Sequence, residues 1–183
     1  MDMNTPTANA AQEATDEVSF RFVSEDSISL ESKQAFSERA TEKLIDFYNY
    51  LNIVSDSSYD TIFRKKAEEL LYKLCIDEHI KVIISQNGSK KLIALNELSS
   101  QLLKGGITFN AKPLDNAIFI TDTSFIKNLN SFTGSLSYSI MNENVNTEFY
   151  IKKTEKIFGE KKEKVWEVLL GSTAIDSLKR RPI

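Results

Sequence analysis

The stretch LYKLCIDEHIKVIISQNGSKKLIAL, residues 71–95, decides the fold class, because the spacing of its apolar residues changes within it. Up to Cys75 the apolar side chains recur every three or four residues, which is the period of a helix that buries one face. After residue 79, two short apolar runs flank Asn87-Gly88, a dipeptide that suits the two-residue turn of a β-hairpin. The sequence therefore predicts a helix followed directly by two antiparallel strands.

The same stretch holds Cys75 and His79, the single cysteine and the single histidine of the chain. A thiol and an imidazole four residues apart resemble a nucleophile and its base, provided that the helix continues through both. Cys75 extends the apolar stripe of the helix by one turn from Leu71, whereas His79 falls in the connector before the first strand. We therefore expect Cys75 to be a small buried apolar side chain, and we expect structural roles for both residues.

Two helices are predicted before the hairpin. The first runs from about Ser32 to Val54, and its apolar stripe is Phe36, Ala40, Leu44, Phe47, Tyr48 and Leu51. The stripe of the second helix is Tyr59, Ile62, Phe63, Ala67, Leu70, Leu71, Leu74 and Cys75. Its opposite face carries Arg64, Lys65, Glu68 and Glu69. Ser57 and Asp60 resemble a capping box at the start of this second helix.

A short helix and several strands are predicted after the hairpin. The helix lies within residues 96–106, with Asn96 as its N-cap and Gly105-Gly106 at its end. The predicted strands are residues 117–123, 134–141, 147–158 and 163–175. Alternation places Leu136, Tyr138 and Ile140 on one face of their strand, opposite Ser135, Ser137 and Ser139. By the same rule, one face of the last strand carries Trp166, Val168 and Leu170.

Helices that precede a set of strands predict an α+β domain, with the helices packed on one face of an antiparallel sheet. We expect a disordered tail over residues 1–17, a single domain over 18–178 and an exposed basic tail over 179–183. Although the C-terminal part is basic, the net charge of −3 argues against nonspecific binding of nucleic acid. The sequence has no apolar run long enough to span a membrane and no visible secretory signal, which favours the cytoplasm.

The order helix, helix, hairpin, short helix and antiparallel strands resembles the NTF2-like (cystatin-like) superfamily. The features that resemble it are the helices FSERATEKLIDFYNYL, YDTIFRKKAEELLYKLC and LNELSSQLL, within residues 30–176. The resemblance implies a strongly curved sheet that wraps around the helices as a cone. Members include isomerases, dehydratases, ligand binders and accessory proteins, so the fold leaves the function open. Enzymatic members tend to place Asp, His or Tyr inside the cone, and the candidates here are Asp115, Asp122, Tyr138 and His79.

Three classes of function follow from these observations. We favour a noncatalytic binding module, which holds a protein partner on the open sheet face or a small apolar ligand against Leu136, Tyr138, Ile140, Trp166 and Val168. The second is an isomerase or dehydratase with Asp115 or Asp122 as base and Tyr138 as hydrogen-bond donor to the oxyanion. The third is a structural or assembly subunit of a larger complex. We expect a homodimer through the sheet face and neither a cofactor nor a metal, since no phosphate-binding loop or metal motif is present.

Overall fold

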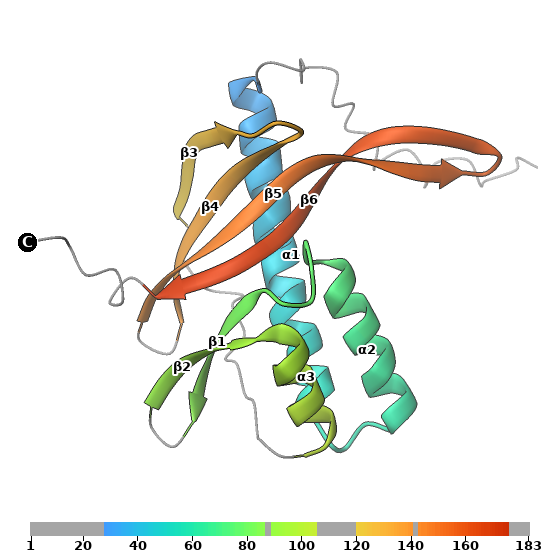
Figure 1. Cartoon of the computed structure of the whole chain (residues 1–183), viewed down its shortest axis with the longest axis vertical. Coiled ribbons are helices and arrows are strands. Elements are labelled where there is room, and N and C mark those ends of the chain that lie inside the picture. Colours follow the sequence, from blue (N-terminus) through green and yellow to red (C-terminus); the bar gives the residue numbers. More distant parts are fainter. Residues whose placement is uncertain (1–27, 87–88, 106–119, 141–142, 176–183) are drawn as a thin grey trace, which may run out of the picture.

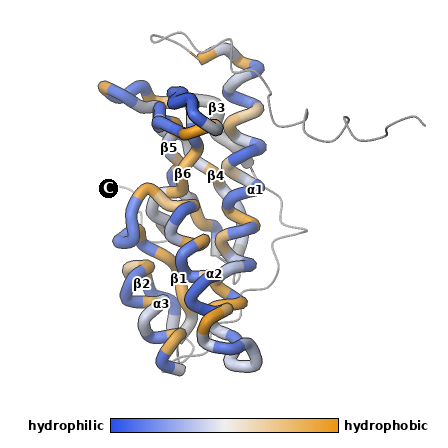
Figure 2. The backbone as a smooth tube through the Cα atoms, turned by 90° about the vertical axis from the view of Figure 1, so that its right-hand side faces the viewer, coloured by the Kyte–Doolittle hydropathy of each residue, from blue (hydrophilic) through white to orange (hydrophobic). Residues whose placement is uncertain are grey.

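The computed structural model describes residues 28–86, 89–105, 120–140 and 143–175, where helices pack against antiparallel sheets (Figure 1). The predicted α+β class is therefore confirmed. The long first helix runs along a four-stranded sheet, and two shorter helices and a separate hairpin lie around its C-terminal half (Figures 1 and 2). Both predicted tails lie outside the described residues.

Helix α1 (Leu30–Ser55) is the central element of the fold. It begins at Ser29, whose hydroxyl oxygen accepts a hydrogen bond from the backbone N–H of Ser32 at 3.1 Å. This cap satisfies one of the first-turn N–H groups that have no partner inside a helix. All six residues of the predicted stripe are buried, so the spacing predicted the buried face correctly: Phe36, Ala40, Leu44, Phe47, Tyr48 and Leu51.

Helix α2 (Thr61–Lys73) begins one turn later than the predicted capping box requires. Asp60 is the N-cap, and its Oδ1 accepts a hydrogen bond from the N–H of Phe63 at 2.8 Å. The predicted role of Ser57 is therefore wrong. The predicted stripe is also wrong at this end of the helix, where the exposed residues include Tyr59, Ile62 and Phe63. The buried residues of α2 are Arg64, Ala67 and Leu71.

The orientation of α2 is set by Arg64, which the sequence pattern had placed on the solvent face and which is only 8% exposed. Its Nε donates to the carbonyl oxygen of Val54 at 2.8 Å, and its Nη2 donates to that of Leu102 at 2.8 Å. These carbonyls lie in the last turns of α1 and of α3 (Leu95–Leu103), where C=O groups lack helical partners and carry partial negative charge. The Arg64 guanidinium therefore donates hydrogen bonds to one carbonyl group near the end of each of two helices. The side of α2 that carries Arg64 consequently faces the core.

Strands β1 (Lys81–Gln86) and β2 (Ser89–Ala94) form the predicted hairpin. Gln86 pairs with Ser89, so the two strands are joined by two residues, as the Asn-Gly dipeptide predicts. The turn residues themselves lie outside the described part of the chain. The hairpin contacts the main sheet through Lys81, whose backbone N–H donates to Oγ of Ser172 at 3.0 Å.

Helix α3 follows β2 without a loop, and it therefore begins two residues earlier than predicted. Ala94 occupies the N-cap position and offers no side-chain hydrogen bond, so the predicted cap at Asn96 is wrong. Asn96 lies in the first turn, where its N–H donates to the carbonyl oxygen of Glu78 at 2.9 Å. The helix ends at Leu103, and Gly105 follows its C-cap as predicted, with a φ of 71° that suits a residue without a side chain.

The main sheet has the strand order β3 (Ile120–Lys127), β4 (Ser131–Ile140), β5 (Glu143–Phe158) and β6 (Lys161–Ile175). Each strand is antiparallel to its neighbour. The connector after α2 continues the sheet at the β6 edge. There the N–H of Ile76 donates to the carbonyl oxygen of Leu170 at 2.8 Å, and the N–H of Leu170 donates to that of Leu74 at 2.8 Å. The connector therefore adds a short parallel bridge to a strand from the other end of the chain.

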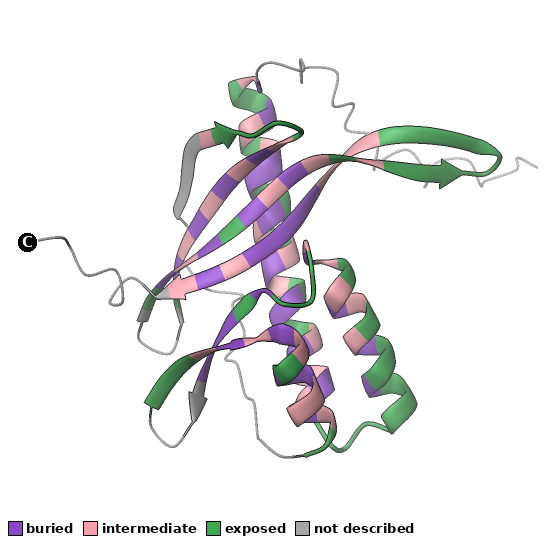
Figure 3. Cartoon of the chain, viewed as in Figure 1, coloured by how far each residue is buried: buried purple, intermediate pink, exposed green. Residues whose placement is uncertain are grey.

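Strands β5 and β6 continue past the end of β4 as a two-stranded arm, which we define as residues 153–166. The last residue of β5 that pairs with β4 is Lys152, opposite Ser131. Beyond it the arm projects from the body and is largely exposed (Figures 1 and 3). Its turn is tighter than the four residues left between the predicted strands 147–158 and 163–175, because Phe158 pairs directly with Lys161 and Gly159 adopts a φ of 61°.

The aromatic ring of Phe149 in β5 packs directly over Gly134 in the neighbouring strand β4. Gly134 pairs with Phe149, and a Cβ at Gly134 would lie 2.3 Å from Cζ of the Phe149 ring. The ring therefore occupies the space above the glycine. The same ring contacts Phe125 of β3 edge-on, with centroids 5.6 Å apart. Gly134 thus sets how β3, β4 and β5 pack on this face.

Replacing Gly134 with Ala is expected to lower the free energy of unfolding by about 1–3 kcal/mol, because the Phe149 ring must move to admit one methyl group. Urea denaturation of the variant and the wild type measures this difference. Ser135→Ala, on the opposite face of the same strand, is the matched control and should change stability by less than about 0.5 kcal/mol. An unchanged stability for Gly134→Ala would contradict the position of the ring.

Candidate functional site

Four buried hydroxyl groups meet between α1 and the main sheet, and we call them the hydroxyl cluster: Tyr48, Tyr138, Thr147 and Thr173. The phenol oxygens of Tyr48 and Tyr138 are 3.3 Å apart. The Tyr138 oxygen is 2.8 Å from Oγ1 of Thr147, which in turn is 2.9 Å from Oγ1 of Thr173. The cluster therefore satisfies its polar atoms internally, as buried hydroxyl groups require.

The register of the sheet brings these residues together. Tyr138 lies on β4, and Thr147 on β5 pairs with both Leu136 of β4 and Thr173 of β6, so the hydroxyl groups come from three adjacent strands. Tyr48 reaches them from the buried stripe of α1. Sequence alternation predicted the inward direction of Tyr138 but not that of Thr173. The register of β5 and β6 shifts between Thr147 and Phe149, which moves the buried face of β6 from Leu170 to Thr173.

Burial controls the acid–base state of the two phenols. Burial raises the pKa of Tyr48 well above its ordinary value, and the neighbouring Tyr138 adds to this rise. Burial also raises the pKa of Tyr138, although hydrogen bonds with Thr147, Tyr48 and Thr173 oppose part of the rise. Both phenols are therefore neutral at physiological pH and act as hydrogen-bond donors, not as bases.

The hydroxyl cluster belongs to the hydrophobic core. The largest fully buried apolar side chains that α1 and the main sheet contribute to this core are Phe36, Leu44, Leu51, Leu136, Phe149 and Ile151. Tyr48 and Tyr138 are part of the same continuous core. Both phenols are therefore core side chains in the part of the chain that the structure describes.

The five predicted ligand-contact residues differ in their positions relative to the core. Leu136, Tyr138 and Val168 are buried in the core, as the alternation predicted. Trp166 lies at its edge, where its ring is 5.8 Å from that of Phe132 and below the Nζ of Lys153. The side chain of Ile140 lies outside the described set.

Neither predicted catalytic carboxylate can be placed against Tyr138. Asp115 lies outside the described residues, and for Asp122 only the backbone is described, where it pairs with Ser135. Among described side chains, no three or more His, Cys, Asp and Glu residues gather where they could bind a metal ion. The arrangement of an enzyme, with a base beside Tyr138, stays a prediction.

Cys75 and His79 have different environments. Cys75 is buried, and its Sγ donates to the carbonyl oxygen of Leu71 at 3.4 Å. His79 is exposed, and its Nδ1 is 3.1 Å from Nδ2 of Asn96. Burial raises the pKa of the Cys75 thiol to about 12, so the thiol is protonated and unreactive at neutral pH. This environment supports the structural role expected for the cysteine.

Cys75→Ala is expected to lower the free energy of unfolding by at most about 1–2 kcal/mol, since one small buried group is lost. The wild-type protein should react slowly with a thiol reagent under native conditions and rapidly in urea. Fast labelling of the folded protein would contradict the buried position.

The stability of the protein should also depend on Cys75 at alkaline pH. The folded state keeps the thiol proton up to about pH 12, whereas the unfolded chain releases it near the ordinary pKa of 9.0. Between these values the folded state binds more protons, so stability falls as pH rises. Urea denaturation between pH 9 and pH 10 should therefore show a steeper loss for the wild type than for Cys75→Ala. Equal slopes would contradict the raised pKa.

A charged group at the base of the arm was not predicted. Lys43 of α1 donates from Nζ to the carbonyl oxygen of Val168 at 2.6 Å and lies 3.9 Å from Oε1 of Glu167. The same carboxylate oxygen is 3.2 Å from Nζ of Lys156 in the arm. Glu167 also accepts a hydrogen bond from Thr154 at 3.0 Å. These contacts connect the arm to α1, and Lys43 satisfies the carbonyl oxygen of Val168 on the edge strand β6.

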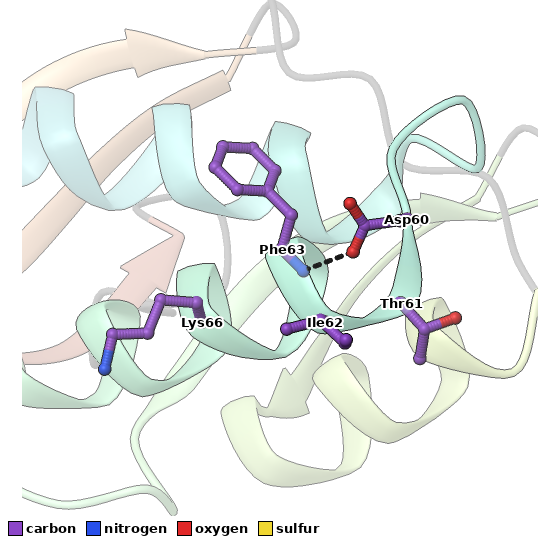
Figure 4. A pocket seen from close by; sticks show the side chains of 5 residues that line it. All are labelled: Asp60, Thr61, Ile62, Phe63 and Lys66. Atoms are coloured by element: carbon purple, nitrogen blue, oxygen red, sulfur yellow. Dashed lines mark hydrogen bonds between the residues drawn. The ribbon is translucent and has the colours of Figure 1, made fainter.

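The first turn of α2 forms a hollow of about 660 Å³ on the surface (Figure 4). Its lining is mainly apolar and consists of Asp60, Thr61, Ile62, Phe63 and Lys66. Beside it the ring of Tyr59 lies 5.2 Å from that of Phe63. Three large apolar residues are therefore exposed within one helical turn, which is typical of a contact surface.

Comparisons with protein-family models, curated proteins and solved structures give no match to this chain. In the described residues, none of the helices combines the length and apolar composition needed to cross a membrane.

Proposed function

We propose that this protein is a noncatalytic module that binds another protein through the outer face of its main sheet. The observation that carries the proposal is the outer face of β4 and β5, whose described side chains are small or polar and remain half-buried or exposed. The proposed resemblance to the NTF2-like superfamily, whose members include accessory proteins, also supports a binding role.

The outer face of β4 and β5 is the proposed contact surface, and we call it the serine face. Its residues are small or polar and are half-buried or exposed: Thr133, Ser135, Ser137, Ser139, Asn144, Asn146 and Glu148. Ser137 donates a hydrogen bond to Oδ1 of Asn146, which holds a cross-strand pair flat against the sheet. Small side chains leave the surface open to a second sheet, and a second copy of the chain is the partner we propose first.

Sedimentation velocity of the full chain tests this proposal. We expect a dimer for the wild type and a monomer for Ser135→Arg, because the long charged side chain blocks the serine face. Ser89→Arg, the same change at an exposed position of β2, should leave the dimer intact. The melting temperatures of both variants should stay close to that of the wild type. A dimer that persists in Ser135→Arg would contradict the serine face as the contact.

The enzyme alternative is supported by one observation, the buried donor pair Tyr48 and Tyr138. Neutral phenols in a low-dielectric site stabilise a developing oxyanion strongly. The alternative requires that the hydroxyl cluster opens to substrate and that Asp115 or Asp122 approaches it. Tyr138→Phe would then abolish turnover with a small change in stability, whereas in a binding module the same variant affects stability alone.

A further inference from the structure

We propose that the arm of one copy inserts its apolar tip into the hollow on α2 of a second copy. This contact uses neither the serine face nor the interior, so it goes beyond the proposed function. It rests on two exposed apolar surfaces of the same chain that differ in shape and in charge.

The arm tip is the projecting surface. Ile157 is 69% exposed and Phe158 is 54% exposed, and they are the last two residues of β5 before the turn. Successive residues of a strand point to opposite faces, so the tip presents an apolar side chain on each face. Exposed lysines usually keep a free strand edge from pairing, and the arm has several. An apolar pair at the extreme end of such a ribbon has no role in the protein's own core.

The hollow on α2 is the receiving surface. Ile62 is 83% exposed at its rim, and Phe63 and Tyr59 form a ring pair beside it. The hollow is shallow and open to solvent, so it offers an exposed apolar surface to a partner. The hydrogen bonds of Arg64 turn one side of α2 toward α1 and α3. The apolar residues Ile62 and Phe63 of the first turn remain exposed.

A copy cannot fill its own hollow with its own arm. The arm projects sideways from the upper half of the structure, whereas α2 lies in the lower half (Figure 1). The base of the arm is held to α1 through Glu167, Lys43 and Lys156. An arm that enters the hollow therefore comes from a different copy.

The charges around the two surfaces are complementary. The turn of the arm is flanked by Lys161, Lys162 and Lys164, and lysines outnumber glutamates six to three in residues 152–164. Beside the hollow, residues 56–69 contain four acidic and three basic residues, a balance of −1. Opposite charges steer two surfaces toward one another and set their orientation.

The contact is head-to-tail, because each copy offers one arm and one hollow. Such a contact does not close on itself after two copies, so assemblies lengthen as the concentration rises. The surfaces are small compared with stable interfaces, and we expect association only at high micromolar concentration. Because charges contribute, the association should weaken in high salt.

The test is sedimentation velocity of the full chain from micromolar to submillimolar concentration. Phe158→Glu removes the arm tip and Ile62→Glu removes the rim of the hollow, and both side chains are exposed enough for folding to continue. Leu129→Glu is the matched control, since Leu129 is 95% exposed but lies on neither surface. We expect the mean mass of the wild type and the control to rise with concentration. In each of the other two variants this rise should be lost while the melting temperature is kept.

Mixing the two variants completes the test. The mixing is done with Ser135→Arg present in both copies, so that the serine face does not contribute. The Phe158→Glu copy retains its hollow and the Ile62→Glu copy retains its arm, so the mixture should form one contact per pair. The expected result is a rise in mass that stops at one additional copy. No rise in the mixture, or none in the wild type, would overturn the proposal and leave the arm tip to a different partner. Ser135→Arg separates the two contacts: it should abolish the serine-face dimer and leave the concentration-dependent rise.

Discussion

Leu136→Asp should unfold the protein or leave it without a cooperative thermal transition. Leu136 is completely buried and pairs with Thr147 in the centre of the main sheet. A carboxylate there must be ionised without a partner or protonated without hydrogen bonds, and either state costs several kcal/mol. That cost is comparable with the whole stability of an ordinary domain. Circular dichroism during heating gives the measurement.

Ser137→Asp is the matched control, because it introduces the same side chain one residue further along β4. Ser137 lies on the serine face, so the carboxylate remains in contact with water. The melting temperature should change by only a few degrees, about what a surface substitution produces. Ser137→Asp should nevertheless weaken a dimer built on that face. If Ser137→Asp unfolds the chain and Leu136→Asp does not, the assignment of the two faces is reversed.

Arg64→Ala should lower the free energy of unfolding by about 2–4 kcal/mol. The change removes the side-chain donor of the Val54 carbonyl, and an unsatisfied buried group costs about 1–3 kcal/mol, whereas the Leu102 carbonyl keeps the N–H of Gly105 at 3.0 Å. It also removes the packing of the side-chain stem between three helices. Urea denaturation of the variant measures the loss.

Lys65→Ala is the control for this prediction. Lys65 is the next residue of α2 and is exposed, so its removal should change stability by less than about 0.5 kcal/mol. Arg64→Lys should recover part of the loss, because a single ammonium group cannot reproduce the separate Nε and Nη2 contacts of the guanidinium. A stability for Arg64→Ala equal to that of Lys65→Ala would show that the helix ends have other donors.

Periodicity was sufficient where apolar residues alone decide which side is buried. The stripe of α1, the strands on either side of Asn87-Gly88 and the inward direction of Leu136 and Tyr138 all follow from spacing. In these elements the hydrophobic effect and the local backbone preference favour the same structure.

Periodicity predicted the buried positions Ala67 and Leu71 of α2 correctly but failed in its first turn, where the charged residue Arg64 is buried in place of Ile62 and Phe63. Because Arg64 is charged, the sequence pattern predicts an exposed side chain. Its acceptors are carbonyl groups at the ends of two other helices, and only the tertiary fold brings these groups close to it. The hydroxyl cluster was hidden for a similar reason. Tyr138 could be assigned to the inner face, whereas Thr147 and Thr173 become its partners only through strand register.

The bridge between the connector and β6 has a consequence for how the chain folds during synthesis. The segment around Cys75 emerges from the ribosome long before Leu170, yet the two are hydrogen-bonded neighbours in the finished sheet. Pairing over such a sequence separation is slow, because the intervening chain loses entropy before the contact forms. Until β6 arrives, the backbone at Leu74 and Ile76 is an unpaired edge that another chain can bind. The nascent protein is therefore most exposed to misassembly while its last strand is still being made.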